Sequence, residues 1–396
     1  MSENVAQTFP DGLTGLKPQP GANFNYVDPN SRLVSFDLLE RFVKDVFVAA
    51  GVPAPDAEVI TEILSTADKC GIDSHGIGRV KAFYIDRIRK GILNPVTNFE
   101  VVRETNTTAV IDGHNGMGHV IAQRACDMAI AKAKEHGMGM VVCRNSTHYG
   151  IAGYYTRRAA DQDIIMMVGT NARPAIAPTF SVKPMLGTNP LSFGIPSDEE
   201  FPFNLDCATA ITNRGKVEVY DRIDKDIPEG WVIGQDGKYR TDSGQILKDL
   251  LTGQAALCPL GGNSELTGGY KGFGYALVVE IFSSCLQAGN FMYGVSGIGK
   301  DGKPCPVELG HFFVAINPAA FREVDDFKKQ VGDVLREIRA ATKAPGCERI
   351  YTPGEKEHIA YKRRTEVGGT LVPQVLLNEM VEMRNFYNLD YKFDWE

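Results

Sequence analysis

The chain has 396 residues, which exceeds what one hydrophobic core usually organises, so two or three domains are expected. Its net charge is −7, and its 42 basic residues form no cluster interleaved with aromatic side chains, which argues against nucleic acid as a partner. No apolar run approaches the roughly eighteen residues that a membrane span requires, so no membrane partner is expected.

Residues 1–30 predict a loose N-terminal extension. They contain Pro, Gly, Asn and acidic residues, and they lack both the apolar core of an export signal and an Arg-rich amphipathic face. The eight cysteines lie far apart, form no Cys-x-x-Cys pair and sit mostly in apolar stretches. We therefore expect a reduced, cytoplasmic protein.

Residues 31–105 predict the N-terminal part of a helical domain. Ser35 is a suitable N-cap for a helix over 36–50, in which the apolar positions follow helical spacing. A second helix with one apolar stripe is expected over 55–69. A third is expected to follow and to end near residue 90.

This third helix carries the first candidate site, in the sequence Asp73-Ser74-His75-Gly76 followed by Arg79. Side chains four positions apart on a helix are neighbours, so His75 and Arg79 can reach one small ligand. Imidazole is the usual proton-transfer group near neutral pH, and guanidinium grips a carboxylate through two nitrogens. The pair indicates chemistry on a small carboxylate-bearing substrate, although a capped helix start with a solvated Arg79 is the simpler interpretation in isolation.

Residues 106–320 predict an α/β domain, and residues 321–396 return to helical periodicity. Within the α/β domain, the polar and turn-rich stretch 213–262 is interpreted as a peripheral excursion. Strands are expected at 108–111, 140–143, 164–168, 191–195, 203–206 and 311–316, and helices at 119–136, 150–161 and 272–287.

A second candidate histidine lies in the loop Asn145-Ser146-Thr147-His148-Tyr149-Gly150, between a predicted strand and the next helix. Loops at strand ends commonly form the site of an α/β domain. His148 is therefore a candidate proton-transfer group or hydrogen-bond donor, with a buried neutral histidine as the alternative. His114 and His119 lack metal-ligand spacing, so no metal site is expected. The remaining histidines indicate ordinary surface or capping use: His136, His311 and His358.

Two glycine-rich segments resemble phosphate-binding loops. Residues 297–302 fit Gly-x-Gly-x-x-Gly, but the prolines at 304 and 306 forbid the helix that such a turn must enter. The segment Gly268 to Gly274 does run into an apolar helix, and Lys271 adds a positive charge. It is a candidate anion site, with a plain loop-to-helix junction as the alternative.

Short polar side chains beside predicted strands indicate a nucleotide groove. They occur in Thr170-Asn171, Gly187-Thr188-Asn189-Pro190 and Asp206-Cys207-Ala208-Thr209. Each cluster alone is a turn. Together with the glycine-rich turn before the helix at 272–287, they make ribose and phosphate recognition in one α/β region more plausible.

In order and spacing, these motifs, with Tyr351-x-Pro353-Gly354-Glu355, resemble the malate/L-lactate dehydrogenase family that is unrelated to Rossmann-type lactate and malate dehydrogenases. That family also includes ureidoglycolate, sulfolactate and diketogulonate oxidoreductases and imine-reducing relatives. The resemblance implies an α/β (α+β) fold with an NAD(P)-binding sheet domain of its own, without the Gly-x-Gly-x-x-Gly fingerprint. It also implies a helical domain built from both chain ends, and a homodimer.

The resemblance further implies residue roles. His75 is the expected acid/base residue, Arg79 the carboxylate clamp and His148 a second active-site histidine, and the proton-transfer role falls on one histidine or the other. Cys207 stands where relatives carry other small residues. Cofactor contacts are expected at Thr170, Asn171, Leu205, Asp206, Cys207, Tyr270, Lys271, Gly272, Gly354, Glu355 and Lys356.

The leading hypothesis is an NAD- or NADP-dependent oxidoreductase that transfers hydride between nicotinamide and a small 2-hydroxy acid, with malate or L-lactate as the first candidates. Oxidation of ureidoglycolate or sulfolactate, or reduction of a cyclic imino acid, is the alternative, because these substrates keep the carboxylate. A catalytically idle NAD(P)-binding dimer is the alternative of a different class. The cofactor preference, the physiological direction and any assembly beyond a dimer stay open.

Overall fold

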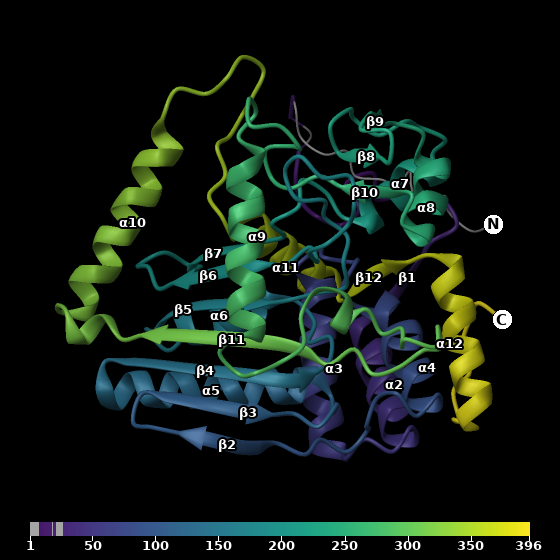
Figure 1. The fold of residues 1–396 in the computed structure, drawn as a ribbon, viewed down its shortest axis with the longest axis horizontal. Coiled ribbons are helices and arrows are strands. Elements are labelled where there is room, and N and C mark those ends of the chain that lie inside the picture. Colours follow the sequence, from purple (N-terminus) through teal and green to yellow (C-terminus); the bar gives the residue numbers. More distant parts are fainter. Residues whose placement is uncertain (1–7, 18, 21–26) are drawn as a thin grey trace.

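The computed structural model describes residues 8–17, 19–20 and 27–396. A mixed seven-stranded sheet lies at its centre (Figure 1), in which β3 and β4 run parallel and the other neighbours antiparallel. This confirms the predicted α/β fold, and all strands but β2 were predicted. In spatial order they are β2 (Glu100–Glu104), β3 (Thr108–Asp112), β4 (Met138–Ser146), β11 (Leu309–Ile316), β5 (Ile165–Thr170), β6 (Leu191–Ile195) and β7 (Phe203–Cys207).

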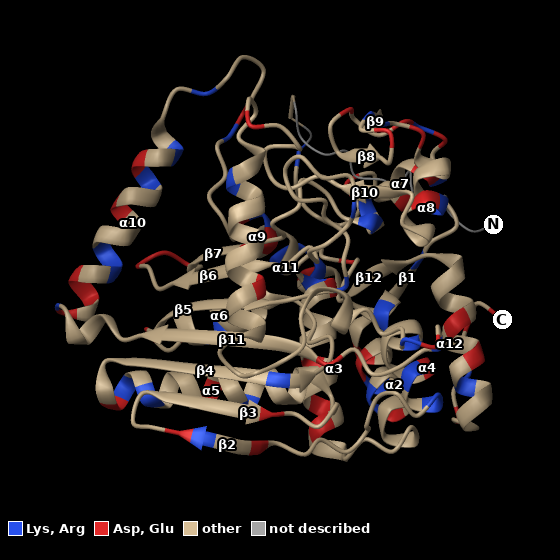
Figure 2. Ribbon diagram, in the orientation of Figure 1, with Lys and Arg blue, Asp and Glu red and all other residues tan. Residues whose placement is uncertain are grey.

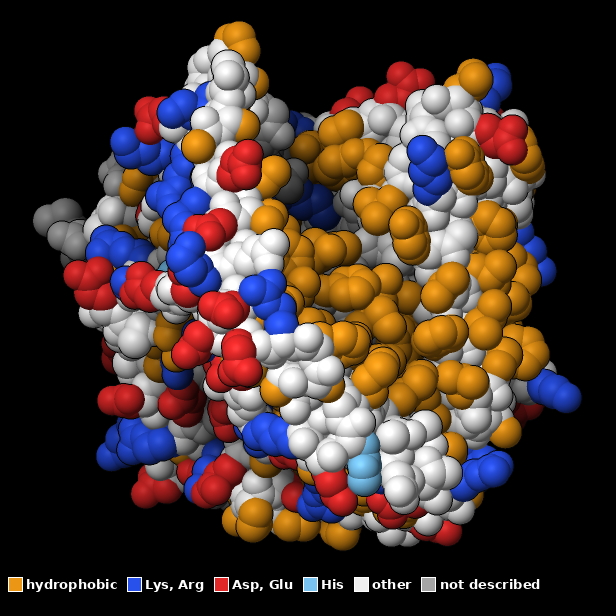
Figure 3. Space-filling view, turned by 90° about the vertical axis from the view of Figure 1, so that its left-hand side faces the viewer, with side chains coloured by type: hydrophobic (Ala, Val, Ile, Leu, Met, Phe, Trp, Pro, Cys, Tyr) orange, Lys and Arg blue, Asp and Glu red, His pale blue; other side chains and the backbone are white. Residues whose placement is uncertain are grey.

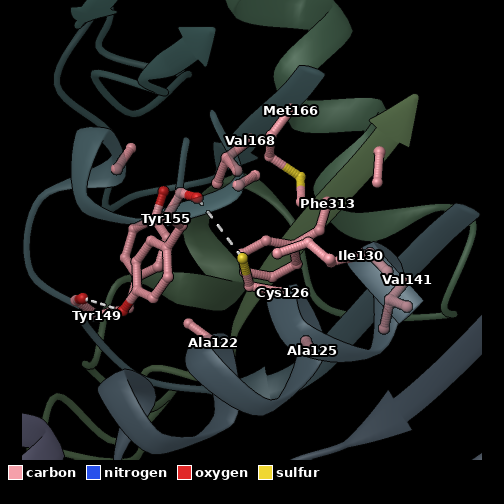
Figure 4. Close-up of a cluster of buried hydrophobic side chains, with 14 of the residues drawn as sticks. Ala122, Ala125, Cys126, Ile130, Val141, Tyr149, Tyr155, Met166, Val168 and Phe313 are labelled. Carbon is pink, nitrogen blue, oxygen red and sulfur yellow. Dashed lines mark hydrogen bonds between the residues drawn. The ribbon is translucent and has the colours of Figure 1, made fainter. Parts of the chain in front are cut away.

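Helices cover both faces of this sheet. Because successive strand residues point to opposite faces, Phe313 faces α5 (Gly118–His136) and α6 (Ala152–Ala160), whereas Phe312 faces α9 (Gly269–Ser284). On the α5–α6 side, the rings of Tyr155 and Phe313 meet edge to face with centroids 5.7 Å apart (Figure 4). The Tyr155 hydroxyl donates to the Tyr149 carbonyl at 2.6 Å, so this core also fixes the loop that carries His148.

The helical domain combines both ends of the chain. α2 (Phe36–Ala49), α3 (Ala54–Lys69) and α12 (Gln374–Tyr387) share one apolar core. As predicted, Ser35 caps α2, because its Oγ accepts a hydrogen bond from the Leu38 N–H at 3.3 Å. The sequence did not predict that β1 (Arg32–Ser35) pairs antiparallel with β12 (Gly369–Val372) in this domain.

The predicted excursion at 213–262 forms a small lobe, whose apolar core is completed by residues outside it, such as Ile176, Leu186 and Ala276. Val217, Val232 and Ile246 are buried in that core. The strands of this lobe are only two or three residues long, so its sequence carries no clear strand pattern and predicted turns instead. It contains α7 (Arg214–Arg222), α8 (Ser243–Thr252), β8 (Val232–Gly234), β9 (Tyr239–Arg240) and β10 (Ala255–Leu257).

Two helices expose apolar side chains on one side of the molecule. α10 (Val324–Ala340) carries charges along its length (Figure 2), yet Val334 and Ile338 are 56% and 53% exposed. On α9, Val278 and Ile281 are 46% and 43% exposed. Figure 3 shows a broad, hollowed apolar surface on this side. Among the described residues, no helix is both long enough and apolar enough to cross a bilayer.

The described part of the N-terminal extension is packed, not loose. Leu13 is fully buried, and the Gly12 carbonyl accepts a hydrogen bond from Arg364 at 2.9 Å. Arg364 belongs to α11 (Glu355–Val367). This packing could not be predicted from the sequence, because one buried leucine among polar and turn-forming residues gives no periodic signal.

Candidate active site

The segment with His75 is not the regular helix that the sequence predicted. His75 lies in a turn after α3, followed by a 3₁₀ turn at Ile77–Arg79, a π-helical turn at Val80–Ile85 and α4 (Asp86–Arg89). The buried Asp68 carboxylate accepts the Ile77 N–H at 2.9 Å, which takes that amide out of the helical pattern. π-helical turns are rare and frequently lie at functional sites.

A buried arginine, Arg364, holds the turn that carries His75 in place. The Arg364 side chain is 2% exposed, forms an ion pair with Asp73 and donates to the Asp68 carbonyl at 2.6 Å. It also donates to Thr370 Oγ1 at 3.0 Å. A buried guanidinium is tolerated only when its donors are satisfied, and these partners satisfy most of them while they tie the turn to α3 and β12.

The structure brings the three predicted catalytic side chains together. The rings of His75 and His148 are stacked with centroids 5.7 Å apart. The Arg79 guanidinium lies 4.6 Å from the centroid of Phe83, whose ring edge meets His148 at 5.3 Å. Arg79 Nε also donates to the Ser74 carbonyl. The guanidinium is thus oriented by its ring contact and this hydrogen bond.

Burial keeps both imidazoles neutral. Desolvation, followed by the positive charge of Arg79, lowers the pKa of His75 to about 4. Desolvation, followed by the neighbouring His75, holds the pKa of His148 well below its ordinary value. At neutral pH, both rings therefore have one nitrogen that donates and one that accepts.

The hydrogen bonds of His148 indicate which nitrogen is which. Its Nδ1 lies 2.5 Å from the hydroxyl of the buried Tyr84 and receives the Gly150 N–H at 3.4 Å. Because a backbone amide only donates, Nδ1 acts as an acceptor, and neutral His148 carries its proton on Nε2. His75 Nδ1 faces the Ser74 hydroxyl at 2.8 Å, which accommodates either tautomer.

Two further histidines lie behind the site, which corrects the interpretation of His311 as a surface or capping residue. Buried His311 lies between Thr170 Oγ1 and Ser146 Oγ at 2.8 and 2.7 Å, and its ring stacks on Tyr149. His119 is also fully buried, with its ring centroid 4.8 Å from that of Tyr84. Burial lowers the pKa of each to about 3. No local sequence signal marks either one, because α5, which carries His119, and β11, which carries His311, are far apart in the sequence.

One of the predicted cofactor residues of β7, Asp206, borders a pocket. Asp206 lines it together with Gly153 from the start of α6 and Gly354 from the start of α11. Asp206 accepts the Gly153 N–H at 2.7 Å, and burial raises its pKa to about 6. The neighbouring Leu205 and Cys207 are partly buried. Gly354 has a φ of +90°, which a side chain would strain.

The residues predicted on α9 divide into packed and exposed groups. The Gly272 backbone is pressed against the 260–262 loop, where a Cβ would lie 2.2 Å from the Leu260 carbonyl oxygen. Tyr270 and Lys271 are exposed at the N-terminal end of α9, with Lys271 Nζ 5.7 Å from the Tyr270 ring centroid. Thus Gly272 serves helix packing, while its neighbours remain available to an anion.

The other predicted cofactor side chains are largely engaged inside the protein. Glu355 is fully buried, pairs with Arg349 and accepts the Thr352 N–H at 3.0 Å. Lys356 Nζ lies 5.1 Å from the Tyr351 ring centroid. Thr170 Oγ1 donates to the Gly310 carbonyl at 2.9 Å, and Asn171 Oδ1 accepts the Gly310 N–H at 2.9 Å. These contacts hold the loops around the site.

Comparisons with known proteins identify the family. A family described as malate/L-lactate dehydrogenase matches residues 34–380. Malate dehydrogenase of Pyrococcus horikoshii is 40% identical over 90% of this chain and 97% of its own length. L-sulfolactate dehydrogenase of Methanocaldococcus jannaschii is 36% identical over 89% of this chain and 96% of its own. The crystal structure of malate dehydrogenase from Entamoeba histolytica has a TM-score of 0.88 and 46% identity, and covers 92% of this chain and 100% of that one.

Proposed function

The chain belongs to the malate/L-lactate dehydrogenase family, and from this premise we propose that it interconverts a small 2-hydroxy acid and its 2-keto acid, with malate and oxaloacetate as the first candidates. It is an oxidoreductase that acts on CH–OH donors. The observation that carries the proposal is the cluster of His75, His148 and Arg79, which sets two neutral imidazoles beside one cation. Malate dehydrogenases at 40% and 39% identity support malate over L-lactate.

Arg79 binds the substrate carboxylate in this proposal. Its Nε is occupied by the Ser74 carbonyl and its plane is held over Phe83, which leaves the two terminal nitrogens to grip a carboxylate. The substrate hydroxyl then faces the two imidazoles. Fixing one end of a small acid in this way supplies much of the rate, because the reacting carbon is already oriented.

We assign proton transfer to His75 and hydrogen bonding to His148. In oxidation, the base needs a free lone pair, and His148 Nε2 carries a proton because its Nδ1 accepts from Gly150. His148 can donate to the substrate oxygen but cannot take its proton. His75 is neutral above its lowered pKa and can present Nε2 as the acceptor. In the reverse direction, protonated His75 returns the proton.

We propose that a dinucleotide binds beside β7. Asp206 and Gly354 line a pocket there, and Lys271 offers an exposed cation at the start of α9, although it does not line this pocket. A bound nicotinamide supplies the hydride acceptor in oxidation and the donor in reduction. We propose NAD or NADP in this role.

Sulfolactate, ureidoglycolate and cyclic imino acids are the alternative substrates, because each keeps a carboxylate for Arg79. An L-sulfolactate dehydrogenase at 36% identity favours the first of these. An assay of NADH and NADPH absorbance with oxaloacetate, pyruvate, sulfopyruvate, the 2-keto acid that corresponds to ureidoglycolate and a cyclic imino acid separates them. Loss of absorbance with oxaloacetate supports the proposal. Loss with another acceptor alone reassigns the substrate, and no loss with any of them, while cofactor binds, supports the idle NAD(P)-binding dimer.

Arg79→Lys should lower kcat/KM about 10- to 100-fold, because lysine replaces a two-nitrogen grip by a point charge. Steady-state kinetics with the best substrate of the panel measures this. Arg41→Lys is the matched control, because Arg41 Nε also donates to a backbone carbonyl, at 3.2 Å, but lies exposed on α2. Equal effects in both variants would remove Arg79 from substrate binding.

We propose a homodimer formed through the apolar surface beside α9 and α10. Exposed apolar patches of this breadth are unusual on monomers, and a second copy is the partner that the resemblance implies. All eight cysteines are free, which fits a reducing compartment such as the cytoplasm.

Ile281→Asp should convert the dimer to a monomer, because it would bury an unpaired charge between the copies. Light scattering coupled to size exclusion measures the mass. Leu251→Asp, at a 65% exposed position on α8, is the control and should leave the mass unchanged. A wild-type protein with the mass of one chain would contradict the homodimer.

A further inference from the structure

The described residues 11–17 and 19–20, here called the N-terminal strap, precede residue 34, where the family match begins. They nevertheless make specific contacts. Leu13 is fully buried, and a Cβ on Gly15 would lie 3.2 Å from Ile359 Cγ2, so the strap backbone lies directly on α11. A segment outside the family match thus forms part of the packed structure.

The first part of the strap reaches the turn of His75 through Arg364. The Gly12 carbonyl accepts from Arg364 Nη2 at 2.9 Å, and the same guanidinium forms the ion pair with Asp73, two residues before His75. A Cβ on Gly71, in the same turn, would lie 3.9 Å from Thr14 Cγ2. The strap therefore supplies one of the acceptors around the buried guanidinium.

The last part of the strap reaches the loop before α11. Gln19 Oε1 accepts the N–H groups of Glu348 and Arg349 at 2.8 and 2.9 Å. Lys17 forms an exposed ion pair with Glu348 at 3.3 Å, which contributes little. Because the side-chain oxygen of Gln19 accepts both backbone N–H groups, it fixes the position of the loop at residues 348–349.

This loop leads directly into the proposed cofactor contacts at 354–356. Residues 341–346 are exposed, and the far end is anchored by Glu355 through Thr352. Between these points, Gln19 is the side chain that binds the loop backbone at 348–349. Without its two hydrogen bonds, the segment would keep the ion pairs of Glu348 with Lys17 and of Arg349 with Glu355, but its backbone amides at 348 and 349 would lose their acceptor.

We propose that the N-terminal strap is a positioning segment for cofactor binding: through Gln19 it orders the 344–356 loop, and so raises the affinity for the dinucleotide. The cofactor part rests on the proposed function, which assigns residues 354–356 to that ligand. Ordering a loop costs conformational entropy. If Gln19 already orders the loop in the folded protein, this cost is not incurred when the dinucleotide binds, so the affinity is higher than for a mobile loop.

The test compares three full-length variants: Gln19→Ala, Gln19→Glu and Gln374→Ala. Gln19→Ala loses the acceptor, and Gln19→Glu keeps an oxygen for both amides. Gln374→Ala removes an exposed glutamine that bonds only to Asn378 among the described residues, at 2.9 Å, and serves as the matched control. The readouts are the dissociation constants of NADH and NADPH by fluorescence, hydrogen–deuterium exchange of residues 344–356, and kcat.

For Gln19→Ala we expect faster exchange across 344–356 and weaker binding of the preferred cofactor by about threefold to tenfold, with kcat changed less than twofold. Gln19→Glu should restore both, and Gln374→Ala should match the wild type. Unchanged exchange, or an unchanged dissociation constant while the wild type binds cofactor, would overturn the positioning role. A wild type that binds neither cofactor would instead overturn the proposed function and, with it, the cofactor part of this inference.

Discussion

His75→Ala should lower kcat for 2-hydroxy acid oxidation by about 10²- to 10⁴-fold, the usual contribution of a general acid/base. Cofactor affinity should change only modestly, because His75 lies on the turn after α3 and not in the pocket beside β7. Stopped-flow or steady-state kinetics measures kcat, and fluorescence titration measures cofactor binding. Unchanged turnover would remove His75 from the mechanism.

The pH profile of the wild type gives a second readout for His75. Its lowered pKa, about 4, leaves the imidazole neutral and able to accept a proton at all higher pH values. In the oxidative direction, kcat/KM should therefore stay level from neutral pH to about pH 5, and fall as the ring is protonated below that.

A control histidine and the second active-site histidine complete the comparison. His114→Ala removes an exposed imidazole that faces Glu100 at 2.6 Å on the sheet edge, and should leave kcat unchanged. His148→Ala should reduce kcat through loss of a hydrogen-bond donor, yet keep the acidic limb of the profile. If that limb disappeared in His148→Ala and persisted in a residually active His75 variant, the proton-transfer role would belong to His148.

Gly76→Ala should lower the free energy of unfolding by about 3 kcal/mol and reduce kcat as well. A Cβ at this position would lie 1.9 Å from Asp68 Oδ1, inside the carboxylate that accepts the Ile77 N–H. Asp68 would have to move, and a buried amide would lose its acceptor. The His75 turn would shift with it.

Chemical denaturation measures the stability change. Gly274→Ala on α9 is the control, because a Cβ there meets nothing within 4 Å and alanine favours a helix interior. It should be neutral or slightly stabilising. A Gly76→Ala protein as stable as the wild type would show that the Asp68 carboxylate is free to relocate.

The sequence predicted those elements that carry local signals. α2 has a capping serine and a regular apolar stripe, and its observed start agrees with that signal. The pairing of β1 with β12 was missed, because it joins short segments from opposite ends of the chain. The His75 helix was wrong for a different reason: a buried side chain, Asp68, competes with helical hydrogen bonding at Ile77. Helical spacing of residues does not reveal such competition.

In the candidate site too, some residues could be predicted from the sequence and others could not. His75, Arg79 and His148 were predicted, and the structure gathers them. Tyr84, whose hydroxyl lies beside His148 Nδ1, could not be predicted as part of the site, because an isolated tyrosine among apolar residues indicates only a core position. Nor did it reveal that Glu355 is buried in ion pairs, since its motif predicts only that it lies near the cofactor.

The closure of the helical domain by both chain ends constrains the order in which the protein matures on the ribosome. The last strand of the central sheet by position in the chain, β11, ends at Ile316, whereas α11 and α12 extend to Tyr387. The sheet can assemble while the C-terminal helices are still being synthesised. β1 must wait for its partner β12, and the His75 turn must wait for Arg364, until residues 364–372 have been synthesised. The nascent chain can thus acquire its sheet before the turn that carries His75 is fixed in place, so the candidate site should form after the sheet.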